Sequence, residues 1–257
     1  MLVAAGRGER LGDDRPKAFA RLGGLPLLAE SLRRLDDSEW IDGIVVVAPP
    51  EWEEPSILVA EELGASKVAA CVTGGATRSA SVRIGLAEVP DAAAVVLVHD
   101  AARPLLPADL VERLIAALGE GFDGAIPGLP VTDTVKRVRD GIVIETPARE
   151  ELFAVQTPQA FVASVLRSAA AGEGSDCASL VEAVGGRIKI VAGDEQLLKI
   201  TKPEDLRRVE AWLAAGVLPV VEQPVVEQPV VEQPEAEEPR DEERPAEEPP
   251  AGRPAAE

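Results

Sequence analysis

Short apolar runs alternate along the first 216 residues with segments in which apolar residues recur every three or four positions. The runs GIVVVA (43–48), AVVLV (94–98) and GAIPG (124–128) are rich in valine and isoleucine and predict buried strands. The helical period is found in three segments, 26–35, 78–89 and 108–118. This alternation predicts an α/β domain whose mostly parallel sheet is covered by helices on both faces.

The two ends of this domain are less regular. Only Met1, Leu2 and Val3 precede the first turn, although a strand usually has about five residues. We therefore expect either an unusually short first strand or a natural chain that begins upstream of Met1. A final helix is predicted over 202–216, with Pro203 in its first turn and a glycine at its end.

The pattern changes within residues 131–150. There TVKRV and GIVIET alternate polar and apolar residues and flank the sequence Arg139–Asp140–Gly141, which is typical of a hairpin turn. The segment predicts a basic, two-stranded β-arm that projects from the domain.

Residues 217–257 have a different composition. VVEQP occurs three times, and 12 acidic residues stand against three arginines, which gives this segment −9 of the total net charge of −19. A segment so rich in proline and charge, and so poor in large apolar groups, cannot form a core. We expect a single domain over 1–216 followed by a disordered acidic tail, rich in proline and glutamate.

Charge and cysteine content narrow the class of protein. The body is also acidic, which argues against a surface for nucleic acid, because such surfaces need clustered cations. The only two cysteines, Cys71 and Cys177, are too few for a disulfide framework. No apolar run approaches the ~20 residues that span a bilayer. We expect a cytoplasmic protein without a membrane partner.

The candidate chemistry begins in the opening sequence MLVAAGRGERLGDDRPK. Its spacing, G-x-G-x-x-x-G, matches neither the dinucleotide fingerprint nor a P-loop. The loop contains Arg7, Arg10, Arg15 and Lys17, which suit a ligand more negative than a dinucleotide. Both this loop and HDAARP (99–104) follow strands, and ligands of parallel sheets bind at the carboxyl ends of strands. The set favours phosphoryl or nucleotidyl transfer, with Asp100 placed to bind a metal.

The chain has a single histidine, His99, and no GxSxG motif. This leaves little for a Ser–His or Cys–His triad of the kind used in acyl transfer. We interpret His99 as a structural residue rather than a base.

Six segments in order, from Leu2 to about Trp212, resemble the 2-C-methyl-D-erythritol 4-phosphate cytidylyltransferase family. They are AAGRGERLGDDRPKAF, TGGATRSASV, HDAARP, VTDTVKR, QTPQAF and LLKITKPEDL. The resemblance implies a Rossmann-like nucleotidyltransferase fold. It also implies transfer of a cytidylyl group from CTP to methylerythritol phosphate, with release of pyrophosphate, by a homodimer in which each β-arm reaches over the partner.

The resemblance implies roles for individual residues. Arg10 and Lys17 would hold the triphosphate and stabilise charge at the α-phosphorus. The CTP contacts would be Ala4, Ala5, Gly6, Gly8, Gly75, Arg78 and Ser81. Asp100 would bind Mg²⁺. The methylerythritol phosphate contacts would be Thr134, Arg149, Thr157, Ser175 and Lys199.

Other interpretations stay open at this point. The family usually has Thr-Asp-Glu or Thr-Asp-Asp where this chain has Ser175–Asp176–Cys177, so this segment departs from the family pattern at Ser175 and Cys177. A ribitol-5-phosphate cytidylyltransferase would share the glycine loop and the TPQ motif, although HDAARP favours the isoprenoid enzyme. A non-catalytic nucleotide sensor with an acidic recruiting tail is a rival of another class, and a dinucleotide-dependent dehydrogenase is a weaker one. Taken singly, each residue also has a structural explanation, such as an ordinary turn, a surface charge or a helix cap.

Overall fold

The structure is a computed structural model and describes residues 1–8, 11, 15–172 and 174–216. A central sheet lies at the middle of this part of the chain. The strand order is β10-β7-β11-β6-β1-β4-β5, and β12 pairs with β7. The pairs that contain β1 or β4, and the pair β12–β7, are parallel, whereas β10 and β11 run antiparallel to their neighbours. The strands are β1 (Leu2–Val3), β4 (Ile44–Ala48), β5 (Val68–Thr73), β6 (Val95–Asp100), β7 (Gly124–Pro130), β10 (Phe153–Val155), β11 (Gln159–Val162) and β12 (Ile188–Ala192).

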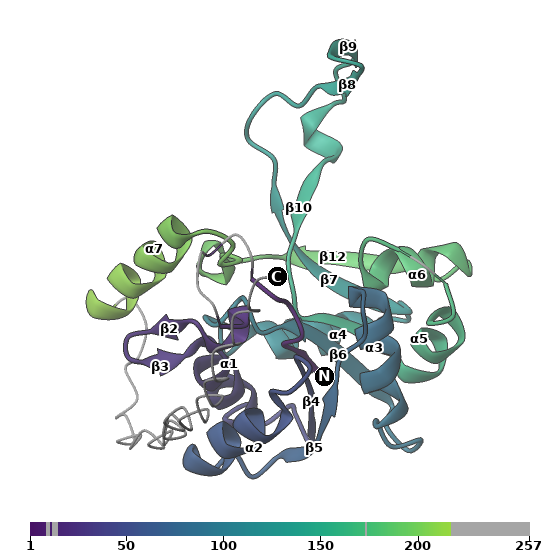
Figure 1. The fold of residues 1–257 in the computed structure, drawn as a ribbon. Helices are drawn as coiled ribbons and strands as arrows, with labels where there is room; N and C mark the ends of the chain where they lie inside the picture. Colours follow the sequence, from purple (N-terminus) through teal and green to yellow (C-terminus); the bar gives the residue numbers. More distant parts are fainter. Residues whose placement is uncertain (9–10, 12–14, 173, 217–257) are drawn as a thin grey trace, which may run out of the picture. The chain divides into compact units, whose positions relative to one another are not determined.

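Helices cover both faces of this sheet, as predicted (Figure 1). On one face, apolar side chains of α1, α2 and α4 pack with Ile44 and Val46. On the other, side chains of α3, α5 and α6 pack with Val96, Val98 and Phe161. The helices are α1 (Leu27–Asp36), α2 (Glu53–Glu62), α3 (Arg78–Ala87), α4 (Leu110–Gly119), α5 (Ala163–Ala169), α6 (Cys177–Ala183) and α7 (Pro203–Ala214), with short 3₁₀ turns η2 (Lys17–Phe19), η3 (Arg149–Glu151) and η4 (Glu195–Leu197).

The apolar pattern located the central elements correctly. The three predicted strands are β4, β6 and β7, and the predicted helices are α1, α3, α4 and α7. β1 has only two residues, Leu2 and Val3. The last helix packs through Val209 against Leu22 and Leu27, which lie in and just after the small hairpin of β2 (Arg21–Leu22) and β3 (Leu25–Pro26).

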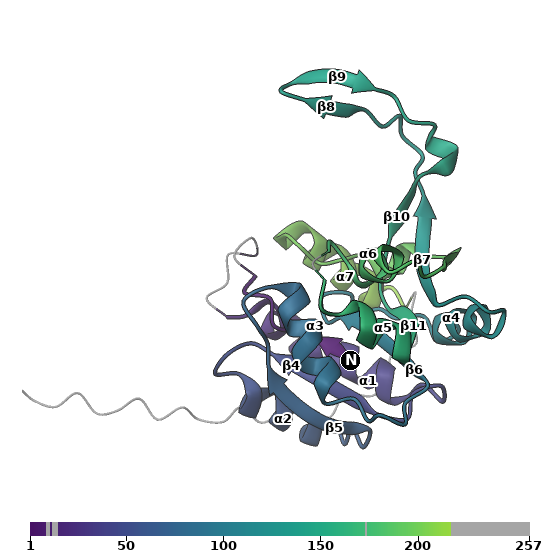
Figure 2. The same cartoon turned by 90° about the vertical axis from the view of Figure 1, so that its right-hand side faces the viewer.

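A second hairpin lies between β7 and β10, where the β-arm was expected. It consists of β8 (Arg137–Arg139) and β9 (Ile142–Glu145). Asp140 and Gly141, its two turn residues, both have positive φ, as a type I′ hairpin turn requires. Figures 1 and 2 show the hairpin well beyond the end of the sheet, joined to it by the paired strands β7 and β10.

The prediction for residues 217–257 lies outside the described residues. Within them, no helix has the length and apolar character that crossing a membrane requires. Cys71 and Cys177 are both free thiols.

Candidate active site

A cavity of about 840 Å³ opens at the carboxyl ends of β1, β4, β5 and β6. It brings together most of the residues that the sequence singled out. Those that line it are Ala4, Ala5, Gly6, Gly8, Lys17, Gly75, Arg78, Ser81, Asp100 and Lys199. Arg10, the other predicted catalytic residue, lies outside the described residues.

The loop after β1 folds back so that Lys17 lies beside its glycines. The backbone N–H of Lys17 donates to the carbonyl of Gly6, at 3.2 Å. Gly8 has a φ of +79°, and a Cβ there would lie 2.8 Å from the Cβ of Lys17. Glycine is therefore needed both for the backbone conformation and for the close approach of Lys17.

The loop after β5 forms the opposite wall. A Cβ on Gly74 would lie 2.3 Å from the Cβ of Ala5, so these two loops touch only because residue 74 has no side chain. The buried hydroxyl of Ser81 accepts the N–H of Gly75 at 3.1 Å and donates to the carbonyl of Thr77 at 2.9 Å. Ser81, in the first turn of α3, therefore fixes the backbone at Gly75. Thr77 and Arg78, at the N-terminal end of the same helix, line the cavity.

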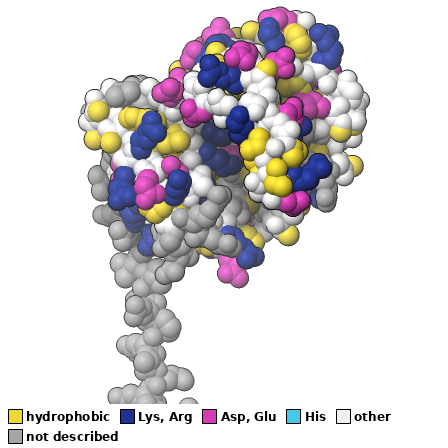
Figure 3. Space-filling view, turned by 90° about the horizontal axis from the view of Figure 1, so that it is seen from above, with side chains coloured by type: hydrophobic (Ala, Val, Ile, Leu, Met, Phe, Trp, Pro, Cys, Tyr) yellow, Lys and Arg dark blue, Asp and Glu magenta, His cyan; other side chains and the backbone are white. Residues whose placement is uncertain are grey.

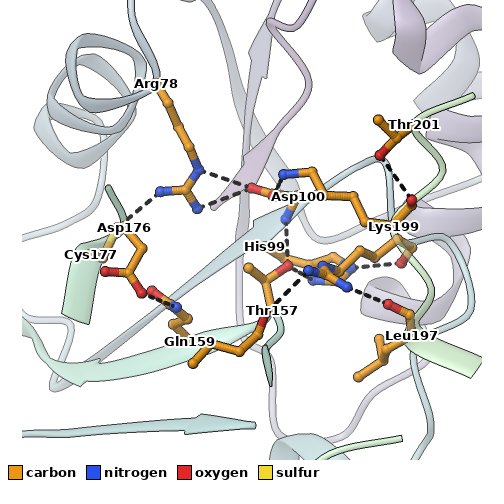
Figure 4. A network of polar contacts seen from close by, with 12 residues as sticks. Arg78, His99, Asp100, Thr157, Gln159, Asp176, Cys177, Leu197, Lys199 and Thr201 are labelled. Carbon is orange, nitrogen blue, oxygen red and sulfur yellow. Dashed lines mark hydrogen bonds and ion pairs between the residues drawn. The ribbon is translucent and has the colours of Figure 1, made fainter. Parts of the chain in front are cut away.

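Asp100, the last residue of β6, lies between two cations. Arg78 donates from Nη2 to Oδ1 at 3.0 Å, and Lys199 donates from Nζ to Oδ2 at 2.6 Å. Figure 4 shows the two cations reaching the carboxylate from different elements. Burial alone would raise the pKa of Asp100, but the charges of Arg78 and Lys199 outweigh burial and hold that pKa well below its usual range. Asp100 is therefore ionised at neutral pH.

Lysine and arginine side chains gather in a hollow of the surface (Figure 3). Among the described residues that line the cavity, the cations are Arg7, Lys17, Arg78 and Lys199, whereas Asp100 is the only carboxylate. A cation-rich cavity in an acidic protein suits a small ligand that carries several negative charges.

His99 and Thr157 lie beneath Asp100 rather than on the cavity wall. His99 is 1% exposed, and burial lowers its pKa to about 4. Its ring nitrogens contact the Thr157 hydroxyl and the Arg103 carbonyl, each at 3.1 Å. The interpretation of His99 as a structural residue fits this position.

Three predicted residues lie elsewhere in the fold. Thr134 and Arg149 are exposed within the arm region, where the Arg149 guanidinium donates to the Thr132 carbonyl at 2.9 Å. Ser175 is exposed just before α6. Its neighbour Asp176 caps that helix and accepts from Gln159, and the Cys177 thiol lies 3.8 Å from the Arg78 guanidinium.

Arg103 is a residue of the site region that the sequence did not single out. Its guanidinium donates to the carbonyl of Leu197 at 2.6 Å and thereby holds the segment that carries Lys199. The residue belongs to HDAARP, but nothing in that motif tells that its arginine reaches a carbonyl 94 positions away.

Comparison with known proteins gives a consistent result. Residues 1–215 match the family model described as 2-C-methyl-D-erythritol 4-phosphate cytidylyltransferase. The chain is 46% identical over 216 residues to the enzyme of that name from Nocardia farcinica, covering 83% of this chain and 92% of the relative. It is 42% identical over 226 residues to the one from Streptomyces coelicolor, covering 83% and 84%. The crystal structure of the Thermus thermophilus enzyme is similar, with a TM-score of 0.67 at 34% identity over 83% of this chain and 98% of that one.

Proposed function

The chain belongs to the 2-C-methyl-D-erythritol 4-phosphate cytidylyltransferase family, and from this premise we propose how its residues carry out the reaction. The enzyme transfers the cytidylyl group of CTP to 2-C-methyl-D-erythritol 4-phosphate, a step of isoprenoid precursor biosynthesis. The observation that carries the residue assignment is the cation-rich cavity around Asp100 at the carboxyl ends of the parallel strands.

The acceptor's own phosphate is the nucleophile in this reaction. One of its oxygens forms a bond to the α-phosphorus of CTP, the bond from that phosphorus to the bridging oxygen of the β-phosphate breaks, and pyrophosphate leaves with the electron pair. The phosphate is already ionised at neutral pH, so the enzyme needs no general base. The burial of the single histidine is consistent with that chemistry.

Charge stabilisation is the main task of the protein in such a transfer. Lys17 would neutralise the charge that develops around the α-phosphorus, and its place beside Gly6 and Gly8 supports that role. Arg10 is assigned the same task on its sequence position alone. The loop Ala4–Gly8 would surround the CTP phosphates, and Gly75, Arg78 and Ser81 would form the wall at its cytosine end.

Mg²⁺ fits this cavity only together with phosphate ligands. Within the described part of the chain, no three His, Cys, Asp or Glu side chains are grouped to hold a metal. Asp100 supplies one carboxylate that is ionised at neutral pH, and Mg²⁺ is commonly held by one or two carboxylates plus substrate phosphates. When bound, the ion would neutralise phosphate charge. Chelation should abolish pyrophosphate release and added Mg²⁺ should restore it; turnover that persists in chelator would contradict this role.

Lys199 would hold the phosphate of methylerythritol phosphate from within the same subunit. Thr134 and Arg149, together with Ser175, would contact the same substrate, although none of the three lines the cavity of its own chain. Thr134 and Arg149 lie in the β-arm region, away from the cavity of their own chain.

The protein would work as a homodimer in which each β-arm completes the partner's cavity. The hairpin exposes 53% of Val138, 68% of Ile142 and 55% of Val143, and an isolated hairpin of this size is marginal in water. Contact with a second subunit would cover these side chains and bring the partner's Arg149 to the substrate. Both free thiols suit a reducing cytoplasm, and the placement of cations inside a cavity suits small anions rather than nucleic acid.

Pyrophosphate release from CTP that depends on 2-C-methyl-D-erythritol 4-phosphate tests this function directly. Failure with that pair of substrates would contradict it.

A further inference from the structure

The Thr157 hydroxyl has both of its principal hydrogen-bonding functions used inside the protein. It accepts the backbone N–H of Asp100 at 3.0 Å and lies 3.1 Å from Nδ1 of His99. Thr157 and His99 are 5% and 1% exposed, so water does not substitute freely for these partners. Figure 4 shows the two side chains directly below the carboxylate.

The direction of these bonds follows from the donors and acceptors available. The other nitrogen of His99, Nε2, lies 3.1 Å from the carbonyl of Arg103, and a carbonyl can only accept. Nε2 must therefore carry a proton. A neutral imidazole has one N–H, so Nδ1 is an acceptor and the Thr157 O–H donates to it.

The result is a chain of bonds that runs in one direction beneath the cavity. Asp100 N–H donates to Thr157 Oγ1, Thr157 O–H donates to His99 Nδ1, and His99 Nε2–H donates to the Arg103 carbonyl. The guanidinium of Arg103 in turn donates to the carbonyl of Leu197, two residues before Lys199. One end of the chain is thus the backbone N–H of Asp100, and the other lies two residues before Lys199, the ion-pair partner of Asp100.

We propose that Thr157 and His99 are positioning residues, which fix the backbone of Asp100 and, through Arg103, the segment of Lys199. Thr157 then has no O–H left to donate to methylerythritol phosphate, so its effect on the reaction is indirect. The proposal rests on the proposed roles of Asp100 and Lys199 for its catalytic consequence, but not for its bonding pattern.

The bonding pattern is tested first, on the free wild-type protein. Because His99 is the only histidine, a long-range ¹⁵N–¹H NMR spectrum contains one imidazole. We expect the proton on Nε2 and an acceptor-type Nδ1 signal. A proton on Nδ1 would overturn the proposal, whatever substrate the enzyme uses.

The catalytic consequence is tested by Thr157→Val, which keeps the shape of the side chain and removes the hydroxyl. We expect kcat to fall ten- to a hundredfold, because a displacement of about 1 Å in a site can cost about 10² in rate. The KM for CTP should stay within about threefold. Thr157→Ser, which restores the hydroxyl, should recover most of kcat.

A merely structural role would give a different result. Ser56→Ala is the matched control, since it removes a buried hydroxyl, bonded to the Trp52 carbonyl, at a site that does not contact Asp100. It should lower Tm and leave kcat unchanged. If Thr157→Val kept wild-type kcat, or if Thr157→Ser lost as much as Thr157→Val, the positioning role would be wrong. If Thr157→Val does not fold, the NMR result on the wild-type protein and the Thr157→Ser kinetics still decide.

Discussion

The ammonium of Lys199 lies 2.6 Å from Oδ2 of Asp100, across 99 positions of sequence. Arg78 reaches the other oxygen of the same carboxylate from α3. The strand β6, the helix α3 and the segment before α7 thus meet at the carboxylate of Asp100. Among the described residues that line the cavity, Asp100 is the one carboxylate and Arg7, Lys17, Arg78 and Lys199 are the cations, which suits a ligand as negative as a nucleoside triphosphate.

Gly74→Ala should weaken CTP binding. The new Cβ would lie 2.3 Å from the Cβ of Ala5, so the two loops that enclose the cavity would have to separate. Such overpacking costs about 1–3 kcal/mol, and we expect the KM for CTP to rise tenfold or more. Gly119→Ala is the control, because a Cβ there meets nothing within 4 Å and should leave KM unchanged. Equal KM values in the two variants would contradict contact between the loops.

Lys17→Ala should act on the transition state. Losing one donor to developing charge lowers kcat by roughly 10²–10³. Steady-state kinetics should show a much smaller change in the KM for methylerythritol phosphate. Lys67→Ala, which removes an ammonium bonded to the Ser38 carbonyl, is the control and should retain activity. A kcat within a few-fold of wild type for Lys17→Ala would remove Lys17 from the catalytic residues.

In the folded protein, His99 should stay neutral at pH values well below 6.5, the usual pKa of a histidine. Burial lowers its pKa from 6.5 to about 4, so between these values the unfolded chain binds a proton that the folded protein does not. This contribution to the free energy of unfolding is complete above pH 6.5 and is lost as the pH falls towards 4, by up to about 1.4 kcal/mol per pH unit. An NMR titration of the single imidazole checks the value. A midpoint near 6.5 in the folded protein would show that the ring is not shielded.

Two inactive variants should restore activity when mixed. In a dimer that shares its sites through the β-arms, Lys17→Ala and Arg149→Ala together form a heterodimer with one site carrying both changes and one carrying neither. Random exchange of subunits should then return up to about a quarter of wild-type pyrophosphate release. If Arg149 acts within its own chain, every site keeps one change. No recovery after demonstrated subunit exchange would contradict the shared site.

The sequence predicted the parts of the fold whose residues follow a simple period. β4 is buried along its whole length, and the apolar residues of α1 and α4 face the core at helical spacing. α2 was missed because Ile57 and Leu58, at its centre, are both 42% exposed and break that period. β10 and β11 have three and four residues, which is too short for a pattern to show.

For the site, residue types were predictable and pairings were not. The glycine loops and their cations could be recognised locally and through the resemblance, and ten of the predicted residues line the cavity. Nothing local indicated that Lys199 pairs with Asp100 or that Thr157 bonds to His99, because those contacts form only when distant segments pack. The resemblance implied that Thr157 contacts the substrate, and its hydroxyl also bonds to the backbone of Asp100 and to His99, which no local pattern indicated.

Pyrophosphate release, measured with each of the four nucleoside triphosphates and with either 2-C-methyl-D-erythritol 4-phosphate or ribitol 5-phosphate in the presence of Mg²⁺, tests the function most directly. We predict rapid release only with CTP and methylerythritol phosphate, and a large loss in the Lys17→Ala control. Preference for ribitol 5-phosphate would assign the cavity to a different acceptor, and no release with any pair would contradict the enzymatic function itself.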